Sequence, residues 1–168
     1  VCIAHRESNY NTSAVGHLNW DGSGDHGLFQ ISDIYWCSLQ GKGKACGLSC
    51  SELEDDDITD DVNCIKMIHE EHTRLSGDGF NAWAVYKSYC QGQSTHYTDG
   101  CNLPFESGPK PVVPRPGITS PTKKIKTKTR PKTYGKGKVY EKCELARELY
   151  YDHNIPMDQV GTWVCIAK

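Results

Sequence analysis

The stretch Asp21-Gly22-Ser23-Gly24-Asp25-His26-Gly27-Leu28-Phe29-Gln30-Ile31 decides the fold that we expect. Its first half is rich in glycine and aspartate, which favour tight turns, and an apolar run follows. This change from turn residues to a buried run predicts one small β-hairpin between short strands. Because longer segments with helical character surround the hairpin, we expect an α+β fold that is mostly helical.

The helical segments are marked by apolar residues that recur on one side. We expect helices over residues 1–8, 60–73, 80–89 and 138–152. In the second of these, the residues expected to face the core are Val62, Ile65, Met67 and Ile68. Two histidines near its end, His69 and His72, are one turn apart, and we expect them on a solvated face.

Nine cysteines in 168 residues indicate an oxidising compartment and a domain held together by disulfides, so we expect a secreted, extracellular protein. Their spacing lacks the close ligand pairs of structural zinc sites, which argues against zinc. No apolar run approaches the roughly 20 residues that a membrane span needs. Because nine is odd, at least one cysteine has no partner within the chain.

The formal net charge of -2 conceals three segments of different composition. Residues 1–103 contain 6 basic and 15 acidic residues, whereas 104–137 contain 9 basic residues, 1 acidic residue and seven of the eight prolines. The second segment has too little apolar surface to fold, and we expect a disordered, basic Pro/Lys/Thr-rich linker. We expect no nucleic-acid partner. The linker is either a solvated tether or a segment that attracts anionic polymers or lipids, and the sequence leaves both alternatives open.

A short repeat links the two ends of the chain. Val1-Cys2-Ile3-Ala4 recurs as Val164-Cys165-Ile166-Ala167. The match predicts a tandem protein in which residues 1–103 form a domain without its opening helix and residues 138–168 begin the next repeat. Adjacent repeats of the same parent chain would then be partners, and Cys165 would be a second copy of Cys2.

Several motifs resemble c-type (chicken-type) lysozymes. His5-Arg6-Glu7-Ser8-Asn9-Tyr10-Asn11-Thr12 resembles the segment that holds their general acid, and residues 21–31 resemble the hairpin that holds their second carboxylate. The match continues through Tyr35-Trp36-Cys37, Phe80-Asn81-Ala82-Trp83 and the cysteine spacing, and Lys142-Cys143-Glu144-Leu145-Ala146 resembles the opening helix. The resemblance covers residues 1–103 and 138–168 and implies a lysozyme-like, disulfide-stapled fold.

The resemblance also implies a disulfide pattern. It pairs Cys2 with Cys90, Cys37 with Cys50, and Cys46 with Cys64. Cys101 matches the cysteine that pairs with the opening helix, which leaves two alternatives. Either Cys101 pairs with Cys143, as in a circularly permuted lysozyme, or both pair outside this chain.

The implied activity is retaining cleavage of β-1,4 bonds in bacterial peptidoglycan, the cell-wall glycan. Glu7 matches the general acid, Asp25 the nucleophile or electrostatic stabiliser, and Trp83 an apolar wall that raises the pKa of Glu7 by desolvation. The implied substrate-binding residues are Asn19, Gln30, Ser32, Tyr35, Trp36, Ala82 and Trp83. His26 and Ser32 depart from the family, which often has Tyr and usually Asn there, so we expect altered support of Asp25.

An acidic segment from Glu52 to Asp61 resembles the calcium loop of α-lactalbumin and of calcium-binding lysozymes. The implied Ca²⁺ ligands are the side chains of Asp55, Asp60 and Asp61 and the carbonyls of Glu52 and Asp57. Capping of a helix by the same acids is the alternative interpretation. A non-catalytic calcium-binding module of the α-lactalbumin type is therefore a second hypothesis, although the presence of both Glu7 and Asp25 favours the enzyme.

Overall fold

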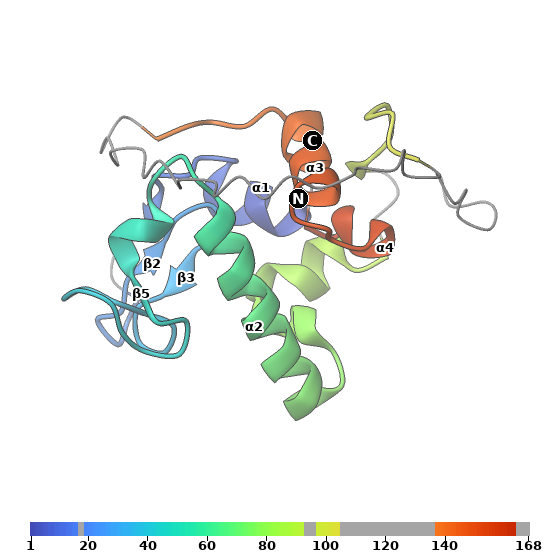
Figure 1. The fold of residues 1–168 in the computed structure, drawn as a ribbon. Helices are drawn as coiled ribbons and strands as arrows, with labels where there is room; N and C mark the ends of the chain where they lie inside the picture. The colour runs from blue at the N-terminus through green and yellow to red at the C-terminus, as the bar shows by residue number, and fades with distance from the viewer. Residues whose placement is uncertain (17–18, 93–96, 105–136, 164–168) are drawn as a thin grey trace, which may run out of the picture.

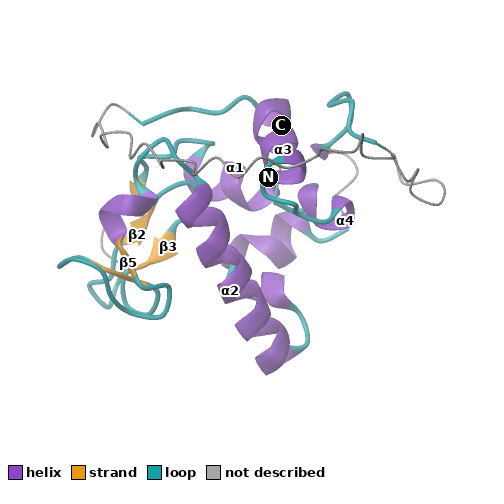
Figure 2. Ribbon diagram, in the orientation of Figure 1, coloured by secondary structure: helices purple, strands orange, loops and turns teal. Residues whose placement is uncertain are grey.

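The long helix α2, Thr59–Ser76, lies between the short strands on one side of the molecule and most of the other helices on the other (Figure 1). This arrangement is seen in a computed structural model that describes residues 1–16, 19–92, 97–104 and 137–163. Figure 2 shows the same division by element type, with helices in purple and strands in orange. The fold is therefore the mostly helical α+β architecture that the sequence predicts.

Helix α2 forms where the sequence predicts it and continues one turn further. Acidic residues occupy its first turn, where the helix dipole favours them, and it ends at Gly77, whose φ of 80° suits glycine. Val62, Ile65 and Ile68 are buried, but Met67 is 44% exposed, so its predicted place in the core is wrong. Met67 is offset from this stripe by about 100° of helix rotation. Within the described ranges, no helix is both long and apolar enough to cross a bilayer.

The predicted hairpin is part of a three-stranded antiparallel sheet. Its strands are β1 (Val15–Gly16), β2 (Asp25–His26) and β3 (Ile31–Ser32). A second, parallel pair consists of β4 (Cys37–Ser38) and β5 (Leu48–Ser49). In the first sheet Asp25 lies opposite both Gly16 and Ser32, which places a carboxylate in the middle strand.

The other helices are short. They are α1 (Cys2–Ser8), the 3-10 turns η1 (Cys50–Leu53) and η2 (Gly79–Ala82), the π-helical turn η3 (Tyr86–Cys90), α3 (Lys142–Tyr151) and α4 (Met157–Val160). The predicted continuous helix over 80–89 is wrong, because Trp83 has an extended backbone that separates η2 from η3. Helix α3 begins later than predicted, since Val139 pairs with Asn11 in a β-bridge instead.

Four disulfides join these elements. They are Cys2–Cys90, Cys37–Cys50, Cys46–Cys64 and Cys101–Cys143. The first three match the pattern implied by the family resemblance. The fourth resolves the alternative left open by the sequence, because Cys101 and Cys143 pair within this chain.

Residues 137–163 pack onto the body and complete its core. The Trp163 side chain is buried and meets Phe80 and Trp83 edge to face, with ring centroids 4.8 and 4.9 Å apart. Leu145 and Leu149 of α3 are fully buried in the same core. The two sequence segments therefore share one hydrophobic core. Of the predicted linker 104–137, residues 105–136 lie outside the described residues, as does the second copy of the repeat, Val164 to Ala167.

Candidate active site

A pocket of about 250 Å³ collects side chains from both parts of the fold. Seven of the predicted site residues line it: Glu7, Asp25, Gln30, Ser32, Trp36, Ala82 and Trp83. Four further lining residues were not assigned to a site from the sequence: Ile31, Ile68, His72 and Ala84. The pocket thus contains both candidate carboxyl groups and two of the candidate aromatic walls.

Glu7 contributes the carboxyl group on the helical side of the pocket. It belongs to the last turn of α1, which is anchored through the Ser8 hydroxyl donating to the carbonyls of Ala4 and Leu28 at 2.8 and 2.7 Å. Burial raises the pKa of Glu7 to about 7, and the negative charge of Asp25 contributes to the rise. This carboxyl group therefore retains its proton up to near-neutral pH.

Asp25 contributes the carboxyl group on the sheet side, in a more polar setting. Its Oδ2 accepts a hydrogen bond from Nδ2 of Asn19 at 3.0 Å, and the same amide donates to Oγ of Ser23 at 2.9 Å. Asn19 itself is exposed and is absent from the pocket lining. The structure therefore places Asn19 beside Asp25, as an outer support of that carboxylate.

Gln30 and Ser32 line the pocket, but their polar side-chain groups form hydrogen bonds to nearby backbone atoms. Nε2 of Gln30 donates to the carbonyls of Ala14 and Gly27 at 3.0 and 2.9 Å. Ser32 lies opposite Asp25 in the sheet, and its hydroxyl accepts from the N–H of Ile34 at 3.3 Å. Both residues therefore stabilise the strands that carry Asp25.

The aromatic residues differ in how they are held. The indole N–H of Trp83 donates to the Phe29 carbonyl at 3.0 Å, which fixes this buried ring at the pocket wall. Trp36 is half-buried in the lining. Tyr35 is 69% exposed and lies outside the lining.

The two histidines of α2 are not on a solvated face, so that prediction is wrong. His72 lines the pocket, with its ring 6.5 Å from that of Trp36. His69 packs edge to face on Phe80 of η2 at 4.5 Å, and burial lowers the pKa of His69. Spacing would have revealed this, because His69 and His72 continue the stripe that begins at Ile65.

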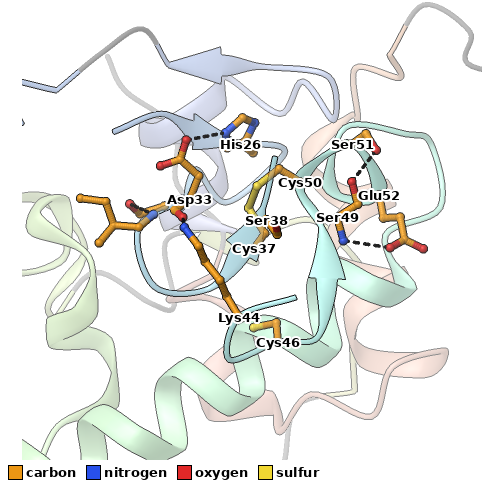
Figure 3. The surroundings of a disulfide bond; sticks show 12 residues. His26, Asp33, Cys37, Ser38, Lys44, Cys46, Ser49, Cys50, Ser51 and Glu52 are labelled. Carbon is orange, nitrogen blue, oxygen red and sulfur yellow. Dashed lines mark hydrogen bonds and ion pairs between the residues drawn. A yellow bond between two sulfur atoms is a disulfide. The ribbon is translucent and has the colours of Figure 1, made fainter. Parts of the chain in front are cut away.

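His26 lies on β2 directly after Asp25, and its imidazole bridges two carboxylates. Its Nδ1 is 2.7 Å from Oε1 of Glu54, and its Nε2 is 3.6 Å from Oδ2 of Asp33. Figure 3 shows the contact with Asp33 beside the Cys37–Cys50 disulfide. The sequence marked His26 as unusual but did not identify these partners. The bridge connects the strand carrying Asp25 to the segment that follows η1.

Asp61 is the most enclosed acid of the acidic segment. It is fully buried, and neither carboxylate oxygen has a hydrogen-bond partner among the described residues. Burial raises the pKa of Asp61 well above its ordinary value, and the charges of Asp55 and Asp60 add to the rise. The backbone N–H groups of Asp61 and Leu28 lie near the carboxylate but outside hydrogen-bonding geometry. They lower the pKa of Asp61 and so offset only part of its rise.

The neighbouring acids are engaged in local contacts. The Glu52 carboxylate accepts a hydrogen bond from the Ser49 N–H at 3.0 Å and pairs with Lys42 at 2.9 Å. Its side chain is therefore occupied, which agrees with the expectation that Glu52 would bind the ion through its backbone carbonyl. Oδ1 of Asp57 accepts from the N–H of Thr59 at 3.1 Å, one of the capping contacts that compete with the calcium interpretation.

The compact group of potential metal ligands found in the described ranges lies elsewhere, at His26, Cys37 and Cys50. Since those two sulfurs are bonded to each other, the group is not a zinc site. A cation in the acidic segment would instead supply the partner that Asp61 lacks. Carboxylate oxygens are the kind of ligand that Ca²⁺ prefers, and the charges of Asp55 and Asp60 are close enough to raise the pKa of Asp61. Binding of the ion would require these three carboxylates to move together around it.

The fold and its pocket define a small, disulfide-stapled α+β protein with two carboxyl groups in one cleft. A family model described as the C-type lysozyme/alpha-lactalbumin family matches residues 1–101. The chain therefore belongs to this family.

Known proteins of the family show the same similarity. The chain is 41% identical to lysozyme c-1 of Anopheles gambiae over 60% of this chain and 67% of that protein. It is 45% identical to lysozyme D of Drosophila melanogaster over 55% and 63% of the two chains. A crystal structure of a lysozyme from Litopenaeus vannamei matches with a TM-score of 0.55 at 36% identity, covering 61% and 78%. The chain thus spans about two thirds of the length of its insect relatives.

Proposed function

We propose that this chain is a muramidase-type glycoside hydrolase, a lysozyme that cleaves β-1,4 bonds of bacterial peptidoglycan with retention. The observation that carries the proposal is that Glu7, whose pKa is raised to about 7, lines the same pocket as Asp25. A glycosidase of this kind needs one carboxyl group that is protonated and another that is ionised. The different surroundings of Glu7 and Asp25 support that division.

In this mechanism Glu7 donates its proton to the leaving glycosidic oxygen. Asp25, held by Asn19, faces the positive charge that develops at the sugar carbon and acts as nucleophile or stabiliser. Lysozymes are the type case of this chemistry, so these roles come from the family. Trp83 excludes water beside Glu7, and Trp36 offers an aromatic face to the sugar.

The test is lysis of a peptidoglycan suspension by the full chain and by Glu7→Gln and Asp25→Asn. Removing a general acid lowers such rates by about 10²- to 10⁴-fold. Glu70→Gln is the matched control, because Glu70 is an exposed glutamate of α2. The wild-type rate should also fall as the pH rises through about 7, where Glu7 loses its proton. A wild-type rate no higher than that of Glu7→Gln would refute the proposal.

We also propose a Ca²⁺ site in the acidic segment, on the observation that Asp61 is buried without a hydrogen-bond partner. The ligands would be the carboxylates of Asp55, Asp60 and Asp61 and the carbonyls of Glu52 and Asp57. The ion would neutralise a segment whose carboxylates repel one another, and it would stabilise the start of α2. If the enzyme proposal fails, a non-catalytic calcium-binding module is the function that remains.

Thermal melting with and without a chelator tests the calcium proposal. Calcium at 100 times its Kd would stabilise the fold by about 2.7 kcal/mol. Asp61→Asn should abolish this response, whereas Asp99→Asn, an exposed acid outside the segment, should retain it. An unchanged melting temperature of the wild type across millimolar calcium would overturn the site.

We propose that the protein acts outside the cell, on bacterial walls. Four disulfides are typical of proteins that fold in an oxidising compartment. The tandem arrangement stays a prediction from the repeated tetrapeptide, and the length of the secreted parent protein, measured by mass spectrometry, tests it.

A further inference from the structure

Trp20 is the most exposed large apolar side chain in the described part of the protein, with 99% of its surface accessible. An indole presents roughly 150–250 Å² of surface when it is not buried. Burying apolar surface stabilises a protein or a complex by about 25 cal/mol for each Å², so an exposed indole can contribute this free energy when it binds a ligand. A side chain of this kind is a strong candidate for contact with a ligand.

The turn that carries Trp20 is closed by hydrogen bonds on both sides. The N–H of Asn19 donates to the Ser23 carbonyl at 2.8 Å, and the N–H of Gly22 donates to the Asn19 carbonyl at 2.8 Å. Oδ1 of Asp21 accepts from both the N–H and the hydroxyl of Ser23, at 3.0 and 2.7 Å. The backbone beneath Trp20 is therefore fixed, so a ligand that orders the ring restricts only the rotamers of this side chain and not the turn.

The same turn is joined to the candidate catalytic group. Asn19, the residue before Trp20, donates to Oδ2 of Asp25 at 3.0 Å. Adjacent Cα atoms are about 3.8 Å apart, so the indole is attached within one residue of a group that touches Asp25. A glycan that leaves the pocket on the Asp25 side would therefore come within reach of the Trp20 ring.

We propose that Trp20 is a binding platform for the glycan outside the pocket, where its ring stacks on the C–H face of a sugar unit. This inference rests on the proposed function, because it assumes a glycan in the pocket. The neighbouring carboxylates of Asp21 and Asp25 favour an uncharged sugar face over an anionic lipid or nucleic acid. The platform adds binding energy only for glycans that are long enough to reach it.

The experiment compares glycans of two lengths on the full chain. Binding of a β-1,4-linked N-acetylglucosamine trimer and hexamer is measured by calorimetry in a Glu7→Gln background, where no substrate is consumed. Trp20→Ala should weaken hexamer binding by about three- to tenfold, with a clearly smaller effect on the trimer. Trp20→Tyr should restore most of the affinity, because it keeps an aromatic face. Tyr151→Ala, an exposed aromatic of α3, is the control and should bind like its parent.

Quenching of tryptophan fluorescence by iodide gives a second measurement. The hexamer should protect the Glu7→Gln protein from quenching, and Trp20→Tyr should remove most of that protection. Equal losses for trimer and hexamer, or full hexamer affinity in Trp20→Ala, would overturn the platform. If the wild type hydrolyses no glycan but hexamer binding still depends on Trp20, the catalytic proposal fails and the platform stands.

Discussion

Glu7 and Asp61 are two carboxyl groups whose pKa is raised chiefly by burial, yet they lie in opposite kinds of site. Glu7 opens into a pocket that it shares with Asp25. Asp61 is fully buried in the first turn of α2, close to Gly27, and neither of its carboxylate oxygens has a hydrogen-bond partner in the described residues. Under the two proposals, the first group would pass its proton to a bound substrate, whereas the second would exchange its proton for a small cation. The two proposals therefore differ in the access to the carboxyl group and not in the direction of its pKa shift.

One glycine lies where the two regions are in contact. Gly27 follows the strand that carries Asp25 and has a φ of +75°. A Cβ at this position would lie 1.9 Å from the Leu53 carbonyl oxygen and 3.1 Å from Oδ1 of Asp61. The pocket side and the acidic segment can therefore pack together only where no side chain intervenes.

The largest effect is expected for Gly27→Ala, which breaks this contact. The substitution should lower the free energy of unfolding by about 3 kcal/mol or more, because it adds a backbone clash to an unfavourable φ. Gly77→Ala is the matched control: its φ is +80°, but open space surrounds it, so it should cost about 1 kcal/mol. Urea unfolding with intact disulfides measures both. Equal losses at the two glycines would show that the clash is relieved by movement.

Local patterns predicted much of the fold, and the failures have a common physical cause. Apolar periodicity located α2, and the matched motifs located Glu7, Asp25 and Trp83 around one pocket. The helix predicted over 80–89 failed because Trp83 turns its indole N–H to the Phe29 carbonyl, a tertiary contact that local propensity does not contain.

Burial of single residues depended on the same kind of long-range packing. Helical spacing places His69 on the buried side of α2, but it does not identify Phe80 of η2, 11 residues further along the chain, as the ring that packs against it. The pairing of Cys101 with Cys143 likewise depends on where α3 packs, which spacing alone does not specify. The exposure of Trp20 has no signal in the sequence, since most indoles are at least partly buried.

A smaller effect is expected for Asp61→Asn, which sharpens the comparison. The folded-state pKa of Asp61 lies above its unfolded value, so in chelator the contribution of this group to stability is fully present below about pH 4 and is lost as the pH rises. Asparagine does not titrate, so near neutral pH the variant should melt several degrees above the wild type. In millimolar calcium the order should reverse. Thermal melts from pH 3 to 8 in both buffers test this, and a gain independent of pH would contradict it.

The smallest effect is expected for the stability of Glu7→Gln. The pKa of Glu7 rises from 4.5 to about 7 on folding, so wild-type stability is lost as the pH rises through this window. The variant should therefore melt a few degrees higher than the wild type above pH 7 and equally below pH 4.5. The gain should be smaller than for Asp61→Asn, because the pocket admits water, and calcium should not alter it. A calcium-dependent gain would mean that the two acids are coupled.

The Cys101–Cys143 disulfide gives the molecule a closed covalent ring. Any single break in the backbone between these two cysteines leaves both pieces attached to each other through sulfur. Residues 104–137 contain nine lysines and arginines, and six of these are not followed by proline, so each of the six offers a trypsin-like protease a cleavable bond inside that ring. A nicked molecule would therefore migrate as one species until it is reduced, and it would keep Trp163 in the core beside Trp83. The Cys101–Cys143 disulfide can therefore hold the two parts of the protein together even when the polypeptide between them has been cut.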